Sequence, residues 1–299
     1  MARVVIALLA VLVLLSGPSC TKRMEEIVYV DTLIAGNDPP PYDGVSSLQL
    51  NIYINRMYID LLGREATAAE QQLARETLQS DPRDPVRRDS AVAPLTRMPV
   101  YYDRLFELAS QDFINGADSA EIAGIMFLIA YMWHLDSLAG NLQNYVFYQA
   151  ELLKLDALLE NTEQYQAGVI TVNDFFRRLL ENWFYDQVNM GSENFVKAAF
   201  DDLFLQHPTE AELAAGIAMV DNAPAILFGQ NGNSKGDFAL IVTQSDAFYE
   251  GLIRKTYRQL LARDPSTDEL VRHLPLLKQT NNWQLLQRQI IISDEYAGF

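Results

Sequence analysis

The chain has 299 residues, a formal net charge of −16 and a single cysteine. Such an acidic chain is repelled by phosphate backbones, which argues against nucleic acid as a partner. One cysteine excludes an intramolecular disulfide framework and a zinc cluster built from several thiolates. The length is sufficient for one large domain, or two small ones, with a proper core.

Residues 1–19 have the layout of a secretory signal. Arg3 supplies a positive charge, Val4 to Leu15 form an uninterrupted apolar run, and small residues precede Cys20. A membrane-spanning helix needs roughly twenty apolar residues, and Gly17-Pro18 ends this run too early. A cleaved signal is therefore predicted, and an uncleaved anchor is the alternative.

The position of Cys20 resembles the bacterial lipoprotein signal, in which that cysteine receives acyl chains such as palmitate and becomes the first residue. The family pattern favours leucine three residues before the cysteine, where this chain has Gly17. The resemblance implies lipidation at Cys20 and attachment to a membrane; a secreted protein with a free thiol is the alternative. Residues 20–45 then form a tether, because Pro39-Pro40-Pro41 favours an extended spacer.

The rest of the chain, 46–299, contains an internal repeat. Residues Tyr53 to Glu70 align without a gap to Leu252 to Glu269, and a weaker third copy runs from Phe195 to Glu212. Each copy places apolar residues at i, i+4, i+7 and i+8, which predicts one face of an amphipathic helix. These residues are Ile54, Tyr58, Leu61 and Leu62; Val196, Phe200, Leu203 and Phe204; and Ile253, Tyr257, Leu260 and Leu261.

A break and a capping box follow the apolar face in every copy. The boxes are Thr67-x-x-Glu70, Thr209-x-x-Glu212 and Ser266-x-x-Glu269, in which the hydroxyl and the carboxylate each accept from a backbone amide at the start of a new helix. Pro208 and Pro265 reinforce the break. We therefore expect helical hairpins at about 51–79, 193–222 and 250–279.

Two copies carry an arginine at the turn, Arg64 and Arg263, where the middle copy has Gln206. The arginines could form a ligand-binding row. The favoured interpretation is structural: a cation at the carboxyl end of a helix that binds the last carbonyls or an acid in the turn.

The pattern aromatic-x-x-Leu-Leu-Gly-Arg-x-Pro-Thr-x-x-Glu resembles a helical repeat domain of unknown function from secreted bacterial surface proteins, which is itself similar to the phycobilisome linker domain. It also resembles the helical region beside the haem domain of some planctomycete cytochrome c proteins. This chain lacks Cys-x-x-Cys-His, so the haem chemistry does not carry over. The resemblance covers the three hairpins and implies a module for packing or assembly, because the linker relatives bind other proteins.

Two or three longer helices are expected between about 118 and 187. The segment from Ile122 to Leu135 lacks a formal charge, and its fourteen residues are too few to span a bilayer, which predicts a core helix with His134 near its end. Phe175 to Tyr185 forms an apolar face, with Phe175, Phe176, Leu179, Leu180 and Trp183, that is expected in the core rather than in a ligand groove. Ser245 and Ser293 are expected to cap helices that carry Phe248 and Tyr296 into the core.

The sequence contains no clear motif for a metal, nucleotide-binding or catalytic site. His134, His207 and His273 lack a metal-binding spacing, and no serine lies in a Gly-x-Ser-x-Gly motif. The segment Phe228 to Asp237 fails as a phosphate loop and as a calcium loop, which leaves a flexible turn between helices. Asp201-Asp202 could serve acid-base chemistry in a cleft, but such a pair is typical of a solvated helix face.

The sequence thus predicts an all-α fold, with repeated helix-turn-helix hairpins packed on a central group of longer helices. The two hairpins from about Phe195 onward are expected to form a subdomain against which the first hairpin docks.

No catalytic residue, cofactor or metal site is predicted. The expected function is that of a non-enzymatic interaction or scaffolding lipoprotein of the cell envelope, at the periplasmic or outer-membrane surface, with other envelope proteins as partners. The alternative is a small-ligand binding protein or a carboxylate-based hydrolase, which converging acids in a deep pocket would favour.

Overall fold

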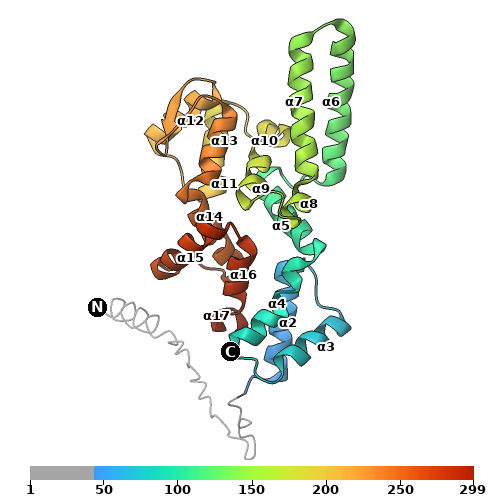
Figure 1. Cartoon of the computed structure of the whole chain (residues 1–299), viewed down its shortest axis with the longest axis vertical. Coiled ribbons are helices and arrows are strands. Elements are labelled where there is room, and N and C mark those ends of the chain that lie inside the picture. Colours follow the sequence, from blue (N-terminus) through green and yellow to red (C-terminus); the bar gives the residue numbers. More distant parts are fainter. Residues whose placement is uncertain (1–43) are drawn as a thin grey trace, which may run out of the picture. The chain divides into compact units, whose positions relative to one another are not determined.

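The computed structural model describes residues 44–299, which form one helical unit with a small two-stranded sheet (Figure 1). The predicted all-α class is confirmed. The predicted signal peptide, Cys20 and the tether as far as residue 43 lie outside the described residues.

The elements follow one another along the chain with short connections. In order they are α2 (Ser47–Leu62), α3 (Ala68–Leu78), α4 (Pro85–Val92), η1 (Leu95–Arg97), α5 (Pro99–Phe113), α6 (Ser119–Ala139), α7 (Leu142–Leu159), α8 (Asn161–Gln166), α9 (Val172–Leu180), α10 (Trp183–Val188), α11 (Ser192–Phe204), α12 (Glu210–Val220), β1 (Ala225–Leu227), β2 (Gln230–Gly232), α13 (Lys235–Gln244), α14 (Asp246–Leu261), α15 (Thr267–Thr280), α16 (Trp283–Ile291) and α17 (Asp294–Ala297).

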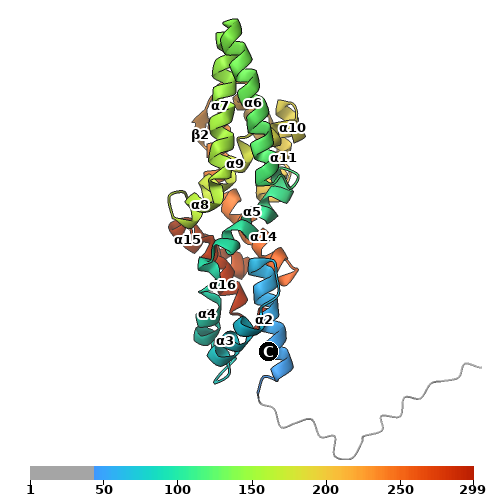
Figure 2. The same ribbon diagram turned by 90° about the vertical axis from the view of Figure 1, so that its right-hand side faces the viewer.

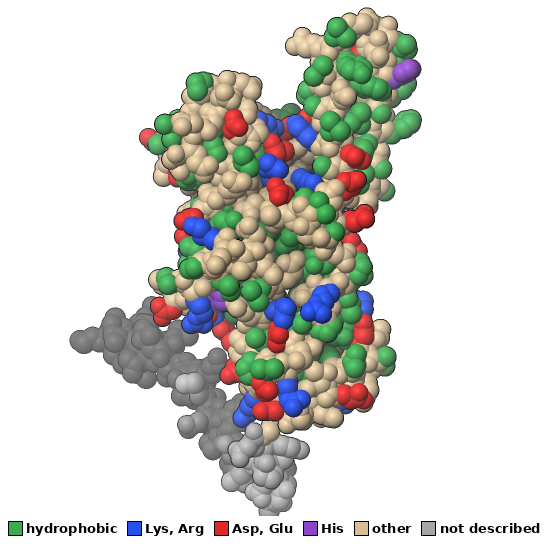
Figure 3. Space-filling model, in the orientation of Figure 1, with side chains coloured by type: hydrophobic (Ala, Val, Ile, Leu, Met, Phe, Trp, Pro, Cys, Tyr) green, Lys and Arg blue, Asp and Glu red, His purple; other side chains and the backbone are tan. Residues whose placement is uncertain are grey.

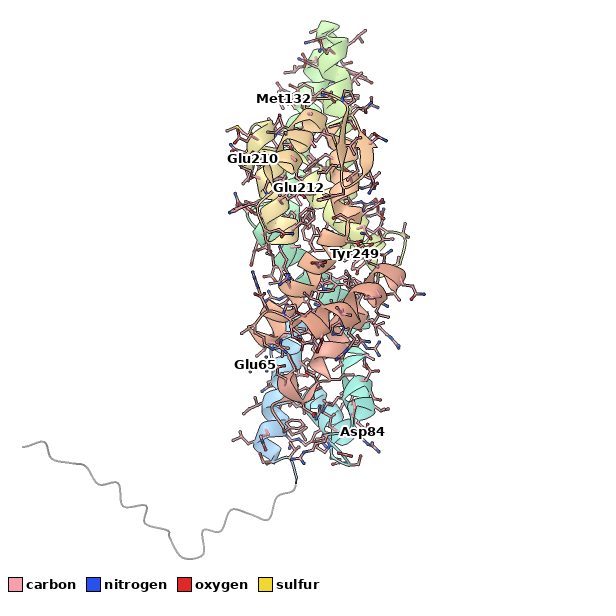
Figure 4. The ribbon with its side chains drawn as sticks, turned by 90° about the vertical axis from the view of Figure 1, so that its left-hand side faces the viewer. Glu65, Asp84, Met132, Glu210, Glu212 and Tyr249 are labelled. Carbon is pink, nitrogen blue, oxygen red and sulfur yellow. The ribbon has the colours of Figure 1, made fainter. Side chains whose placement is uncertain are left out.

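Each repeat segment contains two helices that contact each other: α2 with α3, α11 with α12, and α14 with α15. The second helix of each pair begins at the predicted capping box. At Thr209, for example, Glu212 N donates to Oγ1 over 3.3 Å, and Thr209 N donates to the Glu212 carboxylate over 2.8 Å (Figure 4 labels Glu212). The start of these helices is therefore decided by residues within one turn.

The helix α2, the first of the described residues, lies against the carboxyl-terminal end of the chain (Figure 1). Tyr53 Oη donates to the carbonyl of Ile291 over 3.3 Å, and Tyr296 Oη donates to Asp60 Oδ2 over 2.7 Å. Arg56 adds a 2.9 Å hydrogen bond to the carbonyl of Tyr296. These contacts join α2 to the carboxyl-terminal end, within one unit that spans residues 44–299 and is not divided at Phe195.

The aromatic segment at α9 enters the core as expected. Phe175, Phe176, Leu179 and Leu180 are buried. The helix stops before Asn182, whose side chain is fully buried and accepts from the amides of Phe184 and Tyr185 to start α10. Trp183 therefore lies on a second short helix and is only half-buried.

The predicted core helix from Ile122 to Leu135 is wrong in both length and environment. The helix α6 has 21 residues, and only 11% of its most apolar window, of mean hydropathy 1.5, is buried. It packs against α7, and the two helices project from the remainder of residues 44–299 (Figures 1 and 2). His134 is exposed on it. In the part of the chain that the structure describes, α6 alone has the length and apolarity that crossing a membrane requires.

Candidate functional site

Two features of the described residues qualify as candidate sites. One is the antiparallel pair α6 and α7, residues 119–159, here called the apolar hairpin. The other is a cavity of about 390 Å³ lined by residues of α5, α9, α11, α14 and α16, here called the acidic cavity. The two features differ in chemistry, and each supports a different kind of function.

The acidic cavity combines an apolar floor with charged walls. Phe176, Leu252 and Trp283 contribute buried apolar surface, and its other apolar lining residues are Leu108, Ala109 and Leu205. Its polar lining residues are Gln111, Asp112, Asp201, Asp202, Lys255, Arg258 and Gln259. The volume lies within the range of small-molecule sites. Phe176 thus belongs both to the core and to the wall of a cavity. The apolar pattern of the sequence predicted only its place in the core.

The carboxylates in this cavity have unequal surroundings. Lys255 Nζ lies 2.8 Å from Asp112 Oδ2, and Asp201 Oδ1 lies 2.6 Å from Nδ1 of the exposed His207. Asp202 is more enclosed: burial raises its pKa to about 6, although the hydroxyl of Tyr185, which donates to Asp202 Oδ2 over 2.8 Å, opposes the rise. A carboxyl group that titrates near neutral pH can donate or accept a proton, as a general acid or base must.

We expect Asp202→Asn to change the pH dependence of stability. Burial raises the pKa of Asp202 in the folded state to about 6, so folding disfavours its ionised form. With respect to this group, the domain is therefore most stable below the ordinary pKa of 3.8, and it loses stability as the pH rises from there through about 6. The variant should therefore be more stable than the wild type by about 1 kcal/mol at pH 7.5, a figure reduced for solvation of the cavity, and equally stable at pH 4. Urea unfolding at both pH values measures this; an equal difference at the two pH values would contradict it.

The apolar hairpin carries exposed large apolar side chains along both helices (Figure 3). Ile122 and Ile129 are buried, and Trp133 stacks on Tyr145 with ring centroids 5.1 Å apart, so the side between the helices is filled. The exposed side chains are Phe127, Leu128, Tyr131, Leu135, Leu138, Leu142, Val146, Phe147 and Leu153. In the described residues nothing covers them. Monomeric soluble proteins rarely expose an apolar patch of this extent.

The length of α6 is set by the residues that cap its two ends. Asp118 accepts from the amides of Ala120 and Glu121 at the start of α6, and Gly140 ends it with a φ of 75°. The charge-free run, residues 122–135, begins and ends inside these caps. A prediction based on that run therefore made α6 too short. Figure 4 labels Met132 on this hairpin, beyond the body of the domain.

The turn arginines have structural partners, as predicted. Arg64 donates from both terminal nitrogens to the carboxylate of Glu70, over 2.8 and 2.7 Å. Arg263 binds Glu269 in the same way, over 2.9 and 2.7 Å, and also binds Glu295. Each guanidinium therefore joins the turn to the capping-box glutamate of its own hairpin and is not part of a ligand-binding row.

We expect Glu269→Gln to destabilise the domain by about 1 kcal/mol at pH 7, because glutamine preserves the capping box but loses the charge that binds Arg263. The hydrogen bond with Arg263 lowers the Glu269 pKa to about 2, so this stabilisation is present above pH 4.5 and is lost as the pH falls towards 2. Thermal unfolding between pH 3 and 7 measures it. Glu212→Gln is the matched control, because its turn has Gln206 in place of arginine; an equal loss there would contradict the role of Arg263.

The predicted flexible turn from Phe228 to Asp237 is instead a β-hairpin that leads into α13. Phe228 and Gly229 form its tight turn with φ values of 50° and 75°. Ser234 caps α13, and Asp237 accepts from the amide of Asn233 over 2.9 Å. Lys235 pairs with Asp186. These polar groups are thus used in contacts within the fold.

The three histidines lie in separate places. His134 is on the apolar hairpin, His207 pairs with Asp201, and His273 is buried with its Nε2 3.0 Å from Tyr257 Oη. Within residues 44–299 no three histidine, cysteine or acidic side chains are grouped so as to hold a metal ion. The structure does bring Asp112, Asp202 and Lys255 together, which sequence reasoning missed because they come from different helices.

No protein-family model, curated protein or solved structure matches this chain.

Proposed function

We propose that this protein is a cell-envelope lipoprotein that acts as a non-enzymatic protein-interaction or scaffolding module. The observation that supports the proposal is the apolar hairpin, whose outer side chains, such as Phe127 (76% exposed) and Leu142 (75% exposed), have no covering partner within residues 44–299. Burying such side chains against another protein contributes about 25 cal/mol for each Å² removed from water.

The polar residues of α7 favour a protein partner over lipid. Gln143, Asn144 and Gln149 are exposed among the apolar side chains of this helix. A hydrocarbon environment offers these amides no hydrogen-bond partners, and transfer without a partner costs about 2–7 kcal/mol each. A protein surface can supply donors and acceptors to them. An interaction surface with apolar residues and amides is therefore the better account of the hairpin.

The location is inferred from the sequence. Residues 1–19 and Cys20 resemble a lipoprotein signal, and residues 20–45 are the proposed tether that joins the lipid to the domain. The protein would then act at the periplasmic or outer-membrane surface, with other envelope proteins within reach.

Gentle detergent extraction tests the proposal. The full chain carries a carboxyl-terminal tag, and companions are identified by mass spectrometry. We expect a stoichiometric companion that Tyr131→Glu with Leu138→Glu reduces at least about tenfold, because apolar residues at the centre of an interface dominate binding. The matched control is Leu73→Glu on α3, which is 66% exposed and lies outside the hairpin. The proposal would be overturned if neither a different protein nor a second copy of this chain co-isolated above background, or if the hairpin variant retained its companion.

A second candidate function is small-ligand binding or carboxylate-based hydrolysis at the acidic cavity. It is supported by the three aspartates that line one cavity above an apolar floor, and by the Asp202 pKa of about 6. The carboxylates in the cavity outnumber its lysine and arginine side chains, and its floor is apolar. A small amine with an apolar body would therefore match it best. Thermal-shift measurements with a panel of such amines test it. A shift that Asp202→Asn abolishes would support this function, and a panel without effect would argue against it.

A further inference from the structure

We propose that the partner of the apolar hairpin is a second copy of this chain, and that two hairpins together form a four-helix bundle. The inference rests on the proposed interaction function and deepens it by naming the partner. It is argued from the spacing of the exposed residues, from their area and from the distribution of charge.

The exposed residues of α6 have the spacing of a helix-packing seam. Leu128, Tyr131, Leu135 and Leu138 follow one another in steps of three, four and three residues, the spacing of positions a and d in a heptad. Ile122 and Ile129, seven residues apart, form the buried seam on the opposite side. A helix with two apolar seams is built to pack against two neighbours. Since α7 covers one seam, the other seam lacks a neighbour within residues 44–299.

The second helix of the hairpin repeats this arrangement. Leu142, Val146 and Leu153 are 75%, 63% and 66% exposed and are separated by four and seven residues, which places them along one side of α7. The Trp133–Tyr145 stack fills the contact between the helices. Each helix of the hairpin packs against the other on one side and has an uncovered apolar seam on its outer side within residues 44–299, as expected for half of a four-helix bundle.

The exposed apolar area is large enough for a stable dimer. The seven side chains of the two outer seams are 47–75% exposed. At roughly 100 Å² each, about half of what a buried aromatic side chain covers, they offer roughly 700 Å². Stable interfaces bury about 600–1,000 Å² on each partner. A second hairpin of equal length could cover a surface of this extent.

The distribution of charge favours a second copy over a charged partner. Two chains of net charge −16 repel each other over most of their surface. Residues 122–135 and 142–150, however, carry no Asp, Glu, Lys or Arg, so the hairpins can meet without opposing like charges. The same surface offers little to a strongly basic or acidic partner. A copy of the hairpin presents the matching chemistry, apolar seams with interspersed amides, as a two-fold interface requires.

The test measures the mass of the purified full chain in mild detergent, by sedimentation over a range of concentrations. We expect a dimer, and we expect Leu135→Glu with Leu138→Glu to raise the dimer dissociation constant at least about 100-fold. Leu73→Glu with Val271→Glu is the matched control, since these residues are 66% and 67% exposed on other helices. Circular dichroism checks that both double variants keep their helices. Two copies with different tags should also co-isolate from one membrane.

Three outcomes would overturn the inference. The chain is monomeric at every concentration; or its dimer resists the hairpin variant; or a lipid-soluble photoreactive probe labels residues 119–159 in the native membrane, which would place the hairpin in lipid. If the chain is monomeric but the hairpin variant loses a different stoichiometric protein during envelope extraction, the inference fails while the proposed function stands.

Discussion

Gly251→Ala is expected to destabilise the domain by about 3 kcal/mol or more. A Cβ atom at this position on α14 would lie 2.0 Å from the carbonyl oxygen of Leu203 and 2.9 Å from the Cα of Phe204, both backbone atoms of α11. Backbone cannot move aside as a flexible side chain can, so α11 and α14 would have to separate. Urea unfolding followed by circular dichroism measures the change in free energy.

The matched control for this substitution is Gly124→Ala. Gly124 also lies within a helix, α6, but a Cβ there meets nothing within 4 Å. Alanine is the better helix former, so this variant should be more stable than the wild type by about 0.5–1 kcal/mol. The two substitutions are chemically identical and should have opposite signs. A Gly251→Ala variant as stable as the wild type would show that α11 and α14 are not in such close contact.

Arg88→Met is expected to cost about 2–4 kcal/mol. Arg88 is 1% exposed, donates from Nε to the carbonyl of Pro82 over 2.7 Å, and donates from Nη1 to the carbonyl of Ile292 over 2.8 Å. It also binds the exposed Asp294 over 2.7 Å. Methionine fills similar space but leaves two carbonyls without a donor, and each such loss costs about 1–3 kcal/mol. Thermal and chemical unfolding measure the effect.

Its neighbour Arg87 provides the control. Arg87 is 46% exposed at the side chain and lies 3.9 Å from Asp84 (Figure 4 labels Asp84), so Arg87→Met should change stability by no more than about 0.5 kcal/mol. Similar losses for the two variants would mean that the buried hydrogen bonds of Arg88 do not hold α4 to the carboxyl-terminal end. A loss confined to Arg88→Met would identify Arg88 as one link between these distant segments, beside the Asp89–Arg288 ion pair.

The features that were predicted correctly depend on residues close together in the chain. Thr67, Thr209 and Ser266 each begin a helix because the glutamate three residues later completes the capping box. Ser245 and Ser293 accept from the amides of Phe248 and Tyr296, three residues away, and both aromatic side chains are buried. Arg64 and Arg263 bind glutamates six residues further along, in the first turn of the next helix, although Arg263 also binds the distant Glu295. In each case the interacting groups meet as soon as the local backbone forms.

The candidate sites were not predictable in this way. Asp201-Asp202 was visible as an acidic pair, but the rise of the Asp202 pKa comes from burial at a cavity to which Asp112 and Lys255 also contribute. These residues belong to α11, α5 and α14, and one sequence does not show which helices meet. The sequence did contain the signal for the apolar hairpin, a long charge-free run, but apolarity indicates only that a surface avoids water.

The sequence by itself determined the helical class and the starts of α3, α12 and α15, and it favoured the structural role of the turn arginines, because helix caps and amphipathic spacing act within one or two turns. Only the tertiary structure decided which apolar surfaces are buried and which are exposed. Phe175 and Phe176 meet other helices and enter the core, whereas Leu138 and Leu142 project with α6 and α7 and are exposed within residues 44–299. Burial depends on contacts between distant parts of the chain, so equally apolar segments have different environments.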